Sequence, residues 1–407
     1  MEVIVLDGNQ RPALAITRSL GKRGMRVTVG AETTPSLASC SRFCAGSFGY
    51  PSPYQDPDGF FQAVLERTRR LRHAILIPVT DVTVSEILRK RGEFAEGIAI
   101  PFEDFGKFRL VSDKARLIAF CRTLEIPVPL TFLSEDYRDA EALIDAARSA
   151  VFPLVVKPAV SRIRTEGGWI NAVVRYARTE KELRAVLSSA PFEHSPFLVQ
   201  ERVQGPGVGI FLLMKDGLVL ARFAHRRIRE KPPSGGVSVL CESIEPPSGA
   251  LDAATRLLGN VRWNGVAMVE FKIDERDNVP KLLEVNARFW GSLQLAVSSG
   301  VDFPFLLVRM ARGDEISGFV DYRMGMKVRW ELGDLDHLWI RLFRNSSGLF
   351  LPSRYPSRPR VLANFVTDSF RPSVRNEVFR FRDARPFLHE VGRYVRDAVA
   401  PHPRNKS

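Results

Sequence analysis

The sequence is poor in the residues that build soft-metal sites. Its six histidines are scattered, without an HxxxH or HExxH pair, which argues against a histidine-based zinc site. Of the four cysteines, Cys40 and Cys44 lie close together in CSRFC, whereas Cys121 and Cys241 stand alone. That spacing is only a weak metal or disulfide signal, so we expect reduced, partly buried thiols.

Long apolar runs are also missing. No stretch has the length needed to cross a bilayer, and the chain opens on the strand-like MEVIVLDGNQ rather than on a secretory signal. We therefore expect a cytoplasmic protein without integral membrane association. Internal repeats and low-complexity segments are absent too, so 407 residues of ordinary composition, 45% hydrophobic and 26% charged, predict two or three packed domains.

Negative charge is the scarcer sign, because 46 Asp and Glu face 59 Lys and Arg. The excess favours anionic partners such as phosphates, carboxylates, nucleic acid or an acidic membrane surface. The sequence has no single-strand platform of aromatic and basic residues and no groove-reading motif. Nucleic acid is therefore not expected as a partner.

The beginning of the chain has the pattern of strand, helix and strand, in VIVLDG, RPALAITRSLGKRG and MRVTVG. AILIPVTD, TVSEILRKRGEF and GIAIPF continue the alternation, so residues 1–105 are predicted to form a doubly wound α/β domain. Its first turn, DGNQRPA, lacks the GxGxxG spacing, which argues against a dinucleotide cofactor there.

The remaining chain divides into an α+β region, residues 106–320, and a basic extension, residues 321–407. In the α+β region, FPLVVKPAV and WINAVVRY are predicted to be the two strands of one hairpin. The extension holds two amphipathic helices, in DLDHLWIRLFRNS and DARPFLHEVGRYVRDAV. These helices are expected to pack on the main body, with a membrane-surface role or a homodimer contact as the alternatives.

A second predicted hairpin carries carboxylates. In GVAMVEFKIDERDNVPKLLEVNARFW, two strand-like runs flank a polar turn and place Glu270 opposite Glu284. Two such carboxylates repel by about 4 kcal/mol at about 4 Å and an effective dielectric near 20. Protonation of one acid or a hard divalent cation would offset the repulsion, Asn286 offers a third oxygen on the same face, and Arg288 suits a phosphate or carboxylate. The alternative is a solvated strand face with Lys272 and Arg288 as salt-bridge partners.

Two lysines are placed to meet phosphates that share such a cation. Lys114 lies early in a helix after VSD, and Lys157 ends the apolar strand LVVK; a snorkelling surface lysine is the alternative for each. The loop SRIRTEGG, which follows Lys157, has the polarity and glycines of a mobile flap over phosphates. Gln200 and Glu201 end another apolar strand before a Gly-rich bend, where backbone groups could bind an adenine edge and the carboxylate a ribose.

Together these segments resemble the ATP-grasp superfamily, in its carboxylate–amine ligase and biotin-carboxylase-like branch. The likeness covers roughly residues 1–315 and rests on the order of its motifs, which are DK at 113–114, VVKP at 155–158, the glycine loop, VQERVQG at 199–205, VEFK at 269–272 and EVNARFWGS at 284–292. It implies a pre-ATP-grasp α/β domain followed by two α+β halves that clamp ATP, with a lid over about residues 125–200.

The resemblance also implies a role for each matched residue. ATP would be bound by Lys114, Lys157, Gln200, Glu201, Arg202 and Val203. Magnesium, with Mn²⁺ as the alternative, would be ligated by Glu270, Glu284 and Asn286. Lys157 and Arg288 would be catalytic, with Arg288 facing the acyl phosphate. Ala287 replaces a proline that is frequent in the family, which leaves every ligand in place.

A basic segment, AHRRIREKPPSGGVSVL at residues 224–240, resembles the acceptor side of biotin-carboxylase-like members. Arg226, Arg229 and Lys231 are its candidates for binding an anionic substrate, and solvated surface arginines are the alternative. The implied activity is an ATP-dependent carboxylate–amine ligase that forms an amide through an acyl phosphate, with small or peptide-like acids and amines as substrates. An ATP-dependent carboxylase of bicarbonate and a nucleotide-binding regulatory protein without turnover are the alternatives.

Overall fold

The computed structural model of the chain describes residues 1–165, 167–171, 173–316, 318, 321–344, 349–351 and 355–399. Glu166, in the middle of the predicted flap, lies outside the described residues, as do parts of the predicted C-terminal extension.

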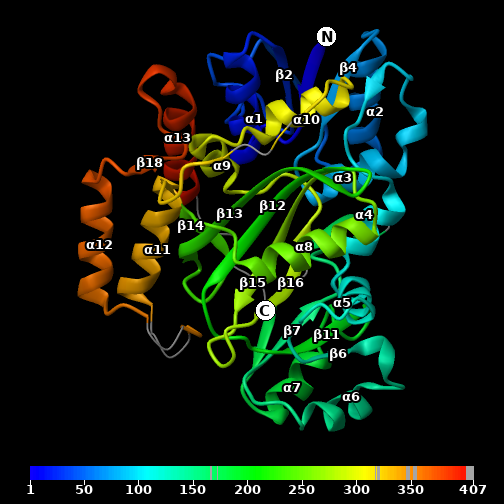
Figure 1. The fold of residues 1–407 in the computed structure, drawn as a ribbon, viewed down its shortest axis with the longest axis vertical. Helices are drawn as coiled ribbons and strands as arrows, with labels where there is room; N and C mark the ends of the chain where they lie inside the picture. Colours follow the sequence, from blue (N-terminus) through cyan, green and yellow to red (C-terminus); the bar gives the residue numbers. More distant parts are fainter. Residues whose placement is uncertain are drawn as a thin grey trace.

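The N-terminal domain is a parallel sheet in the order β3-β2-β1-β4-β5 (Figure 1). Every residue of β1 and β4 is buried, because helices cover both faces of a doubly wound sheet. Its strands are β1 (Glu2–Val5), β2 (Arg26–Ala31), β3 (Gly46–Gly49), β4 (Ala74–Ile77) and β5 (Ile98–Ala99), and its helices are α1 (Arg11–Lys22), α2 (Pro57–Arg69) and α3 (Asp81–Arg89). The predicted βαβ opening is confirmed.

A smaller body follows α4 (Phe105–Ser112) and α5 (Lys114–Thr123); it corresponds to the lid predicted over about residues 125–200 and keeps that name. Its antiparallel sheet has the order β10-β7-β11-β6 and packs on two helices around a core of its own. The strands are β6 (Thr131–Leu133), β7 (Leu154–Pro158), β10 (Arg175–Ala177) and β11 (Phe197–Glu201), and the helices are α6 (Ala140–Ala147) and α7 (Glu180–Leu187).

The segment between β7 and β10 differs from its sequence prediction. The loop SRIRTEGG was predicted without strands and WINAVVRY as one strand, but the structure forms a separate hairpin of β8 (Arg162–Thr165) and β9 (Gly168–Asn171). β10, not β9, pairs with β7. The segment was predicted to be a flexible loop because it is polar and contains glycines. Its sequence shows no clear alternation of apolar and polar residues that would indicate strands.

The largest sheet has the order β16-β15-β12-β13-β14-β17-β18 and crosses the middle of the molecule (Figure 1). All its neighbours pair antiparallel except β17 and β18. Its strands are β12 (Gly207–Lys215), β13 (Leu218–Lys231), β14 (Val237–Ser243), β15 (Gly265–Ile273), β16 (Pro280–Asn286), β17 (Lys327–Arg329) and β18 (Val374–Asn376). Helices α8 (Ser248–Asn260), α9 (Leu293–Ser299) and α10 (Phe303–Ala311) accompany it.

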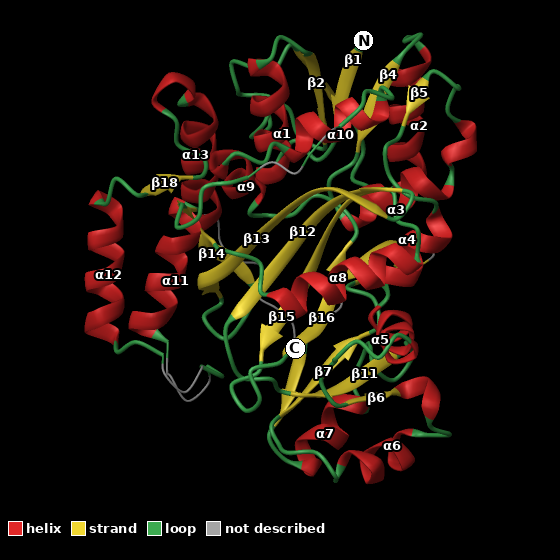
Figure 2. Cartoon of the chain, in the orientation of Figure 1, coloured by secondary structure: helices red, strands yellow, loops and turns green. Residues whose placement is uncertain are grey.

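The C-terminal helices are α11 (Glu331–Phe343), α12 (Arg358–Phe370) and α13 (Arg385–Val399). α11 and α12 lie side by side beyond one edge of the large sheet (Figure 2). Arg229 of β13 fastens both, because its guanidinium is 2.7 Å from Asp334 in α11 and 2.7 Å from Asp368 in α12. The two helices predicted from the sequence are present as α11 and α13, and α12 is an additional helix.

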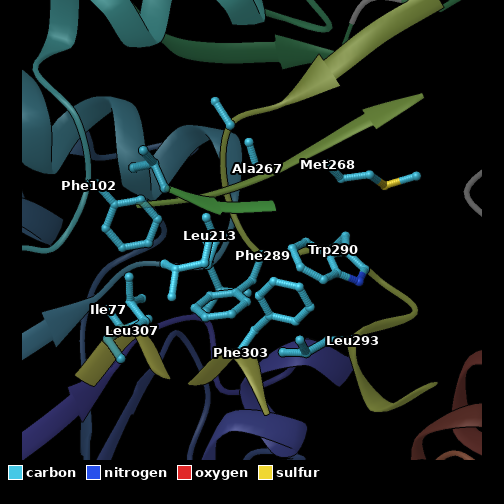
Figure 3. Packing of buried hydrophobic residues seen from close by; sticks show 14 of the residues in the cluster. Ile77, Phe102, Leu213, Ala267, Met268, Phe289, Trp290, Leu293, Phe303 and Leu307 are labelled. Atoms are coloured by element: carbon cyan, nitrogen blue, oxygen red, sulfur yellow. The ribbon is translucent and has the colours of Figure 1, made fainter. Parts of the chain in front are cut away.

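One hydrophobic core joins the N-terminal domain to the large sheet. Figure 3 shows Ile77 of β4 in the same cluster as Leu213 of β12 and Phe303 and Leu307 of α10. Each fully buried side chain of this size stabilises the fold by about 1.5–3 kcal/mol. The lid core is separate, so the N-terminal domain and the large sheet form one packed unit to which the lid is attached.

Two expectations about composition can be compared with the structure. The four cysteines are free thiols, as predicted. Among the described residues, no single helix is long and apolar enough to cross a membrane; α9 and α10 pass that test only as a pair bent by 91°.

Candidate active site

A cavity of about 1140 Å³ lies between the lid, the large sheet and the N-terminal domain. Most of the residues singled out from the sequence line it, and they come from the lid, the large sheet and α5. They are Lys114, Lys157, Gln200, Glu201, Arg202, Val203, Lys231, Glu270, Glu284, Asn286 and Arg288. Arg226 and Arg229 do not line it.

The paired strands β15 and β16 bring the predicted metal ligands together. Glu270 lies directly opposite Glu284 and Met268 opposite Asn286, as the predicted register required, and a bulge follows Glu270. The Asn286 amide nitrogen lies 3.4 Å from Glu284 Oε1. Two carboxylates and an amide oxygen therefore share one face of the hairpin, toward the cavity.

Arg227 neutralises part of this acidic pair, and sequence reasoning missed it. Its guanidinium forms an ion pair with Glu270 and lies 2.8 Å from Glu230 Oε1. Burial raises the pKa of Glu270 to about 7, against the opposing effect of Arg227. Strand alternation was the available signal, because it places Arg227, and not Arg226, on the same face of β13 as the cavity-lining His225.

The two lysines approach the carboxylates from the lid side. Lys114 begins α5, and its Nζ lies 3.5 Å from Glu284 Oε2 while it donates to Ser161 Oγ at 2.9 Å. Lys157 Nζ donates to Gln200 Oε1 at 2.7 Å, and burial lowers the pKa of Lys157 to about 8. Burial alone would raise the pKa of Glu284, but Lys114 and Lys157, together with Arg227, outweigh it, so that pKa lies below its usual value.

The end of β11 forms another part of the lining. Glu201 is already engaged, because its carboxylate accepts from the backbone N–H of Leu130 at 3.0 Å and lies 3.0 Å from Arg276. Lys272 donates to the carbonyl of Val203 at 3.2 Å. Arg202 donates to the carbonyl of Phe350 at 2.7 Å, so the segment after α11 reaches this end of the cavity.

Arg288 is held by the N-terminal domain. Asp81, the first residue of α3, accepts two hydrogen bonds of 2.8 Å from the guanidinium of Arg288. This bidentate contact fixes Arg288 at the cavity wall. Asp81 was not singled out from the sequence, although its place after a parallel strand and at the start of a helix is typical of a site residue in an open α/β sheet.

A buried histidine also faces this wall. His225 lies 3.1 Å from Ser292 Oγ through Nδ1, whereas no described group bonds its Nε2. Burial and Arg227 lower the pKa of His225 well below its usual value, so the ring is neutral at pH 7. Its hydrogen-bonding capacity is thus only half used within the described residues.

The structure separates the three residues predicted for an anionic substrate. Arg226 is exposed and pairs with Glu242, at 2.6 Å. Arg229 is buried against α11 and α12, in contact with Asp334 and Asp368. Only Lys231 lies on the cavity lining, where it forms an ion pair with Asp336. The geometry therefore gives no support to a substrate contact for Arg226 or Arg229.

The donor set suits a hard cation that is shared with a substrate. Within the described part of the chain, no group of three or more His, Cys, Asp or Glu is arranged to hold a metal ion. Glu270, Glu284 and Asn286 offer three oxygen-bearing side chains, too few for a dedicated protein site but enough for magnesium that also binds phosphate. The residues present therefore fit magnesium in company with a nucleotide.

Comparison with solved structures shows the class of this fold. The biotin carboxylase domain of 2-oxoglutarate carboxylase from Hydrogenobacter thermophilus is similar, with a TM-score of 0.63 and 16% identity over 80% of this chain and 73% of that chain. Biotin carboxylase from Campylobacter jejuni gives 0.62 and 15% over 80% and 74%. The N5-carboxyaminoimidazole ribonucleotide synthetase from Thermotoga maritima gives 0.54 and 16% over 80% and 79%.

The sequence comparison points to the same class. Residues 193–333 match the model of the family described as "ATP-grasp in the biosynthetic pathway with Ter operon", and no curated protein sequence matches the chain. The chain therefore has an ATP-grasp fold, with an N-terminal parallel sheet and a C-terminal helical region, and this predicted fold class is confirmed. At these identities the likeness to solved structures shows the fold and not the reaction.

Proposed function

We propose that the protein is an ATP-dependent ligase that activates a carboxylate as an acyl phosphate and transfers the acyl group to an amine. One observation carries this proposal: Glu270, Glu284 and Asn286 face the cavity on one hairpin, and Lys114 approaches Glu284 to 3.5 Å from the lid side. Oxygen ligands for a divalent cation and cations for phosphate thus meet at one place. One solved structure of similar fold carries MgADP and another carries ADP, which supports ATP and Mg²⁺ as the cofactors.

The reaction proceeds in two displacements. A carboxylate oxygen of the substrate attacks the γ-phosphorus of ATP, the bond to the β-phosphate oxygen breaks, and ADP leaves. The amine nitrogen then attacks the acyl carbon, inorganic phosphate leaves and the nitrogen loses a proton. Both steps need positioning and charge neutralisation more than covalent help from the protein.

The proposed roles follow from the positions of the side chains. Magnesium held by Glu270, Glu284 and Asn286 supplies positive charge to the phosphates when it is bound. Lys114 and Lys157 bind the phosphates directly, and Lys157 stays on the transferred group as charge develops. Arg288, fixed by Asp81, binds the acyl phosphate.

Other residues of the cavity lining are assigned to the nucleoside of ATP and to the acceptor. Gln200, Glu201, Arg202 and Val203 border the nucleoside, with the backbone of β11 available to the base because the Glu201 side chain is already bonded. We assign the acceptor to the wall that contains Arg227, in the segment where sequence reasoning had placed Arg226, Arg229 and Lys231.

A second candidate is an ATP-dependent carboxylase, in which bicarbonate is the acid that is phosphorylated. The specific observation in its favour is that one similar structure holds bicarbonate together with MgADP. A regulatory nucleotide-binding protein without turnover is less well supported, because binding alone does not require Glu270 and Glu284 to remain paired across the hairpin.

The test is ADP release from ATP and magnesium in the presence of pools of amino acids, small carboxylic acids and amines, with and without bicarbonate. Mass spectrometry of an active pool identifies the product. A product mass equal to acid plus amine minus water supports the ligase. ADP release that depends on bicarbonate and needs no other acid favours the carboxylase. ATP binding without turnover in any pool contradicts both for substrates of this size.

A further inference from the structure

The hairpin of β8 and β9 is the part of the lid whose position the lid itself does not explain. Within the described residues it shares no strand pairing with the lid sheet, and the chain enters it directly after β7, which ends in the motif of Lys157. Arg162, Arg164 and Trp169 of this hairpin line the cavity. Contacts outside the lid sheet must therefore fix the hairpin over the cavity.

The contacts lie on the N-terminal domain. Glu86 of α3 is fully buried, and its Oε1 accepts from Arg164 Nε at 3.1 Å and from Trp169 Nε1 at 3.1 Å. Arg164 and Trp169 are cross-strand partners in the hairpin, so the one carboxylate oxygen joins both strands. No described group donates to Glu86 Oε2, although this atom is buried.

A backbone contact lies next to this carboxylate. The N–H of Trp169 donates to the carbonyl of Tyr54 at 2.7 Å. Gly168 comes so close that a Cβ atom there would lie 2.1 Å from the same carbonyl oxygen, and its φ of +116° favours glycine as well. The Arg162 guanidinium lies over the Tyr54 ring at 5.9 Å. The hairpin is therefore docked in one defined orientation.

A buried carboxylate with one unbonded oxygen costs stability, so its presence calls for a structural or functional explanation. The position of Glu86 on α3 gives such an explanation, because the first residue of this helix, Asp81, holds Arg288 while Glu86 holds the hairpin. The helix thus fixes two walls of the cavity at once. The N-terminal domain and the large sheet share one core, whereas the lid core is separate, so Glu86 joins the separately packed lid to the main body of the protein.

We infer that Glu86 is a positioning residue that latches the β8–β9 hairpin over the phosphates of the bound nucleotide, by orienting Arg164 and Trp169. This role rests on the proposed function. Arg164 uses Nε for the latch, and no described group accepts from its terminal nitrogens, which leaves them available to a polyphosphate. The latch holds the closed hairpin before the acyl phosphate forms and keeps water from it.

The experiment is hydrogen exchange, followed by mass spectrometry, on wild type and Glu86→Gln, each alone and with ATP and magnesium. The amide introduced by this substitution can still accept from Trp169, but it lacks the charge that attracts Arg164. We expect exchange in peptides covering residues 167–171 to be about tenfold faster in the free variant, since charged hydrogen bonds of this kind are about twice as strong as neutral ones. Peptides of β7 and β11 should be unchanged.

Two further variants separate the latch from general destabilisation. Glu103→Gln is the matched control, because Glu103 is also a buried glutamate of the N-terminal region but bonds Asn264, away from the hairpin. Its hairpin exchange should equal that of wild type. Arg164→Gln changes the other partner, whose side chain is 36% exposed, and it should loosen the hairpin as Glu86→Gln does. The double variant should be no looser than either single one.

A KM-against-kcat comparison tests the positioning role. Glu86→Gln should raise the KM for ATP about tenfold and release ADP without product more often than wild type, because the closed hairpin forms less often. Equal hairpin exchange in Glu86→Gln and wild type overturns the latch. A loosened hairpin with unchanged KM for ATP and unchanged coupling overturns the positioning role. Failure of wild type to bind ATP overturns the proposed function and this role with it, while the exchange comparison without nucleotide still decides whether Glu86 holds the hairpin.

Discussion

Two clusters of basic and acidic side chains each contain an arginine of strand β13, and only one of the clusters faces the cavity. Arg229 of β13, with Arg329, holds Asp334 and Asp368 at N–O distances of 2.6 to 2.8 Å, and all four side chains are buried. Two residues earlier, Arg227 pairs with Glu270. The acid opposite Glu270 is Glu284, whose nearest described cation is Lys114, at 3.5 Å.

The two clusters differ in how completely their charged side chains are paired, which distinguishes charges that stabilise the fold from charges that can bind a ligand. In the C-terminal cluster each carboxylate meets a guanidinium at short range, so a ligand would have to break an existing pair. In the cavity the contacts of Glu284 are long, Lys157 bonds only a neutral amide among the described groups, and burial shifts the pKa of both Lys157 and Glu270 toward neutrality. Incomplete pairing of buried charge marks a functional site better than the presence of charge does.

The largest expected effect is on the incompletely paired side. Glu284→Gln removes the charge that a shared magnesium ion requires, so ADP release should fall by about 100- to 1,000-fold. Thermal stability should fall only slightly, because the lost attraction to Lys114 and Lys157 is partly offset by relief of the burial cost and of the repulsion with Glu270. Steady-state ADP release and a thermal unfolding scan measure the two effects. Glu275→Gln, in the exposed turn of the same hairpin, is the control and should be fully active. Turnover by Glu284→Gln at the wild-type rate would remove the basis of the proposed function.

The C-terminal cluster of Arg229, Arg329, Asp334 and Asp368 should respond in the opposite manner. Asp334→Asn leaves Arg229 and Arg329 without their shared carboxylate, and breaking a buried ion pair of this kind costs about 3–5 kcal/mol. Urea unfolding should show that loss, while the ATP affinity of the folded protein remains within about twofold of wild type because Asp334 does not line the cavity. Asp336→Asn, two residues away and partly exposed, should cost about 1 kcal/mol or less. A variant Asp334→Asn with normal stability and lost ATP binding would reverse the assignment of the two clusters.

Strand periodicity was enough to predict the centre of the site. The symmetric turn in DERDNVP fixed Glu270 opposite Glu284, and apolar runs that end in a polar residue located Lys157 and Gln200. These signals are local, since each depends on one strand or one hairpin. The fold class followed from the same alternation of apolar runs and from the order of the motifs.

Contacts between distant segments could not be predicted in this way. Asp81 and Arg288 are 207 positions apart, and Glu86 and Arg164 are 78 apart; no periodicity in either segment indicates its partner. Arg226 and Arg229 were chosen for their charge and for the resemblance of their segment to an acceptor side, neither of which indicates the face of the strand. The β-bulge after Arg227 changes which face of β13 the next residues occupy. Burial in the folded chain, rather than residue type, decides between a ligand contact and a structural pair.

The pH dependence of nucleotide binding gives a smaller effect on the cavity side. Burial lowers the pKa of Lys157 to about 8, so Lys157 is charged below that pH and loses its charge as the pH rises through it. Affinity for ATP should therefore fall by up to about tenfold between pH 8 and pH 9, as expected for a group whose charged form binds. Calorimetry with ATP and magnesium measures it. Lys157→Arg, which stays charged throughout, should give a flat profile.

The same shift has a consequence for stability with the opposite sign. Because the pKa of Lys157 is lower in the folded chain than in the unfolded chain, the folded state binds fewer protons between about pH 8 and pH 10.5, and this lysine destabilises the free protein most below pH 8. The destabilisation fades as the pH rises through that window.

The outcome that would contradict the binding prediction concerns the two proteins compared by calorimetry. If ATP binding by wild type and by Lys157→Arg shows the same dependence on pH, Lys157 is not a phosphate ligand.

The smallest effect sharpens the comparison along β13. Arg226 is more than half exposed and pairs only with Glu242 among the described residues, so Arg226→Ala should change the unfolding free energy by about 0.5 kcal/mol or less and leave ADP release within about twofold of wild type. Arg227→Ala, at the next position, should lower ADP release by about tenfold or more, because it leaves Glu270 without its guanidinium in the cavity wall. Steady-state kinetics on both variants compares two adjacent arginines that differ in the face of the strand they occupy. A tenfold rise in the acceptor KM of Arg226→Ala, with Arg227→Ala unaffected, would show that the acceptor lies on the outer face of β13 and that the charge of this segment, rather than the cavity it borders, selects the substrate.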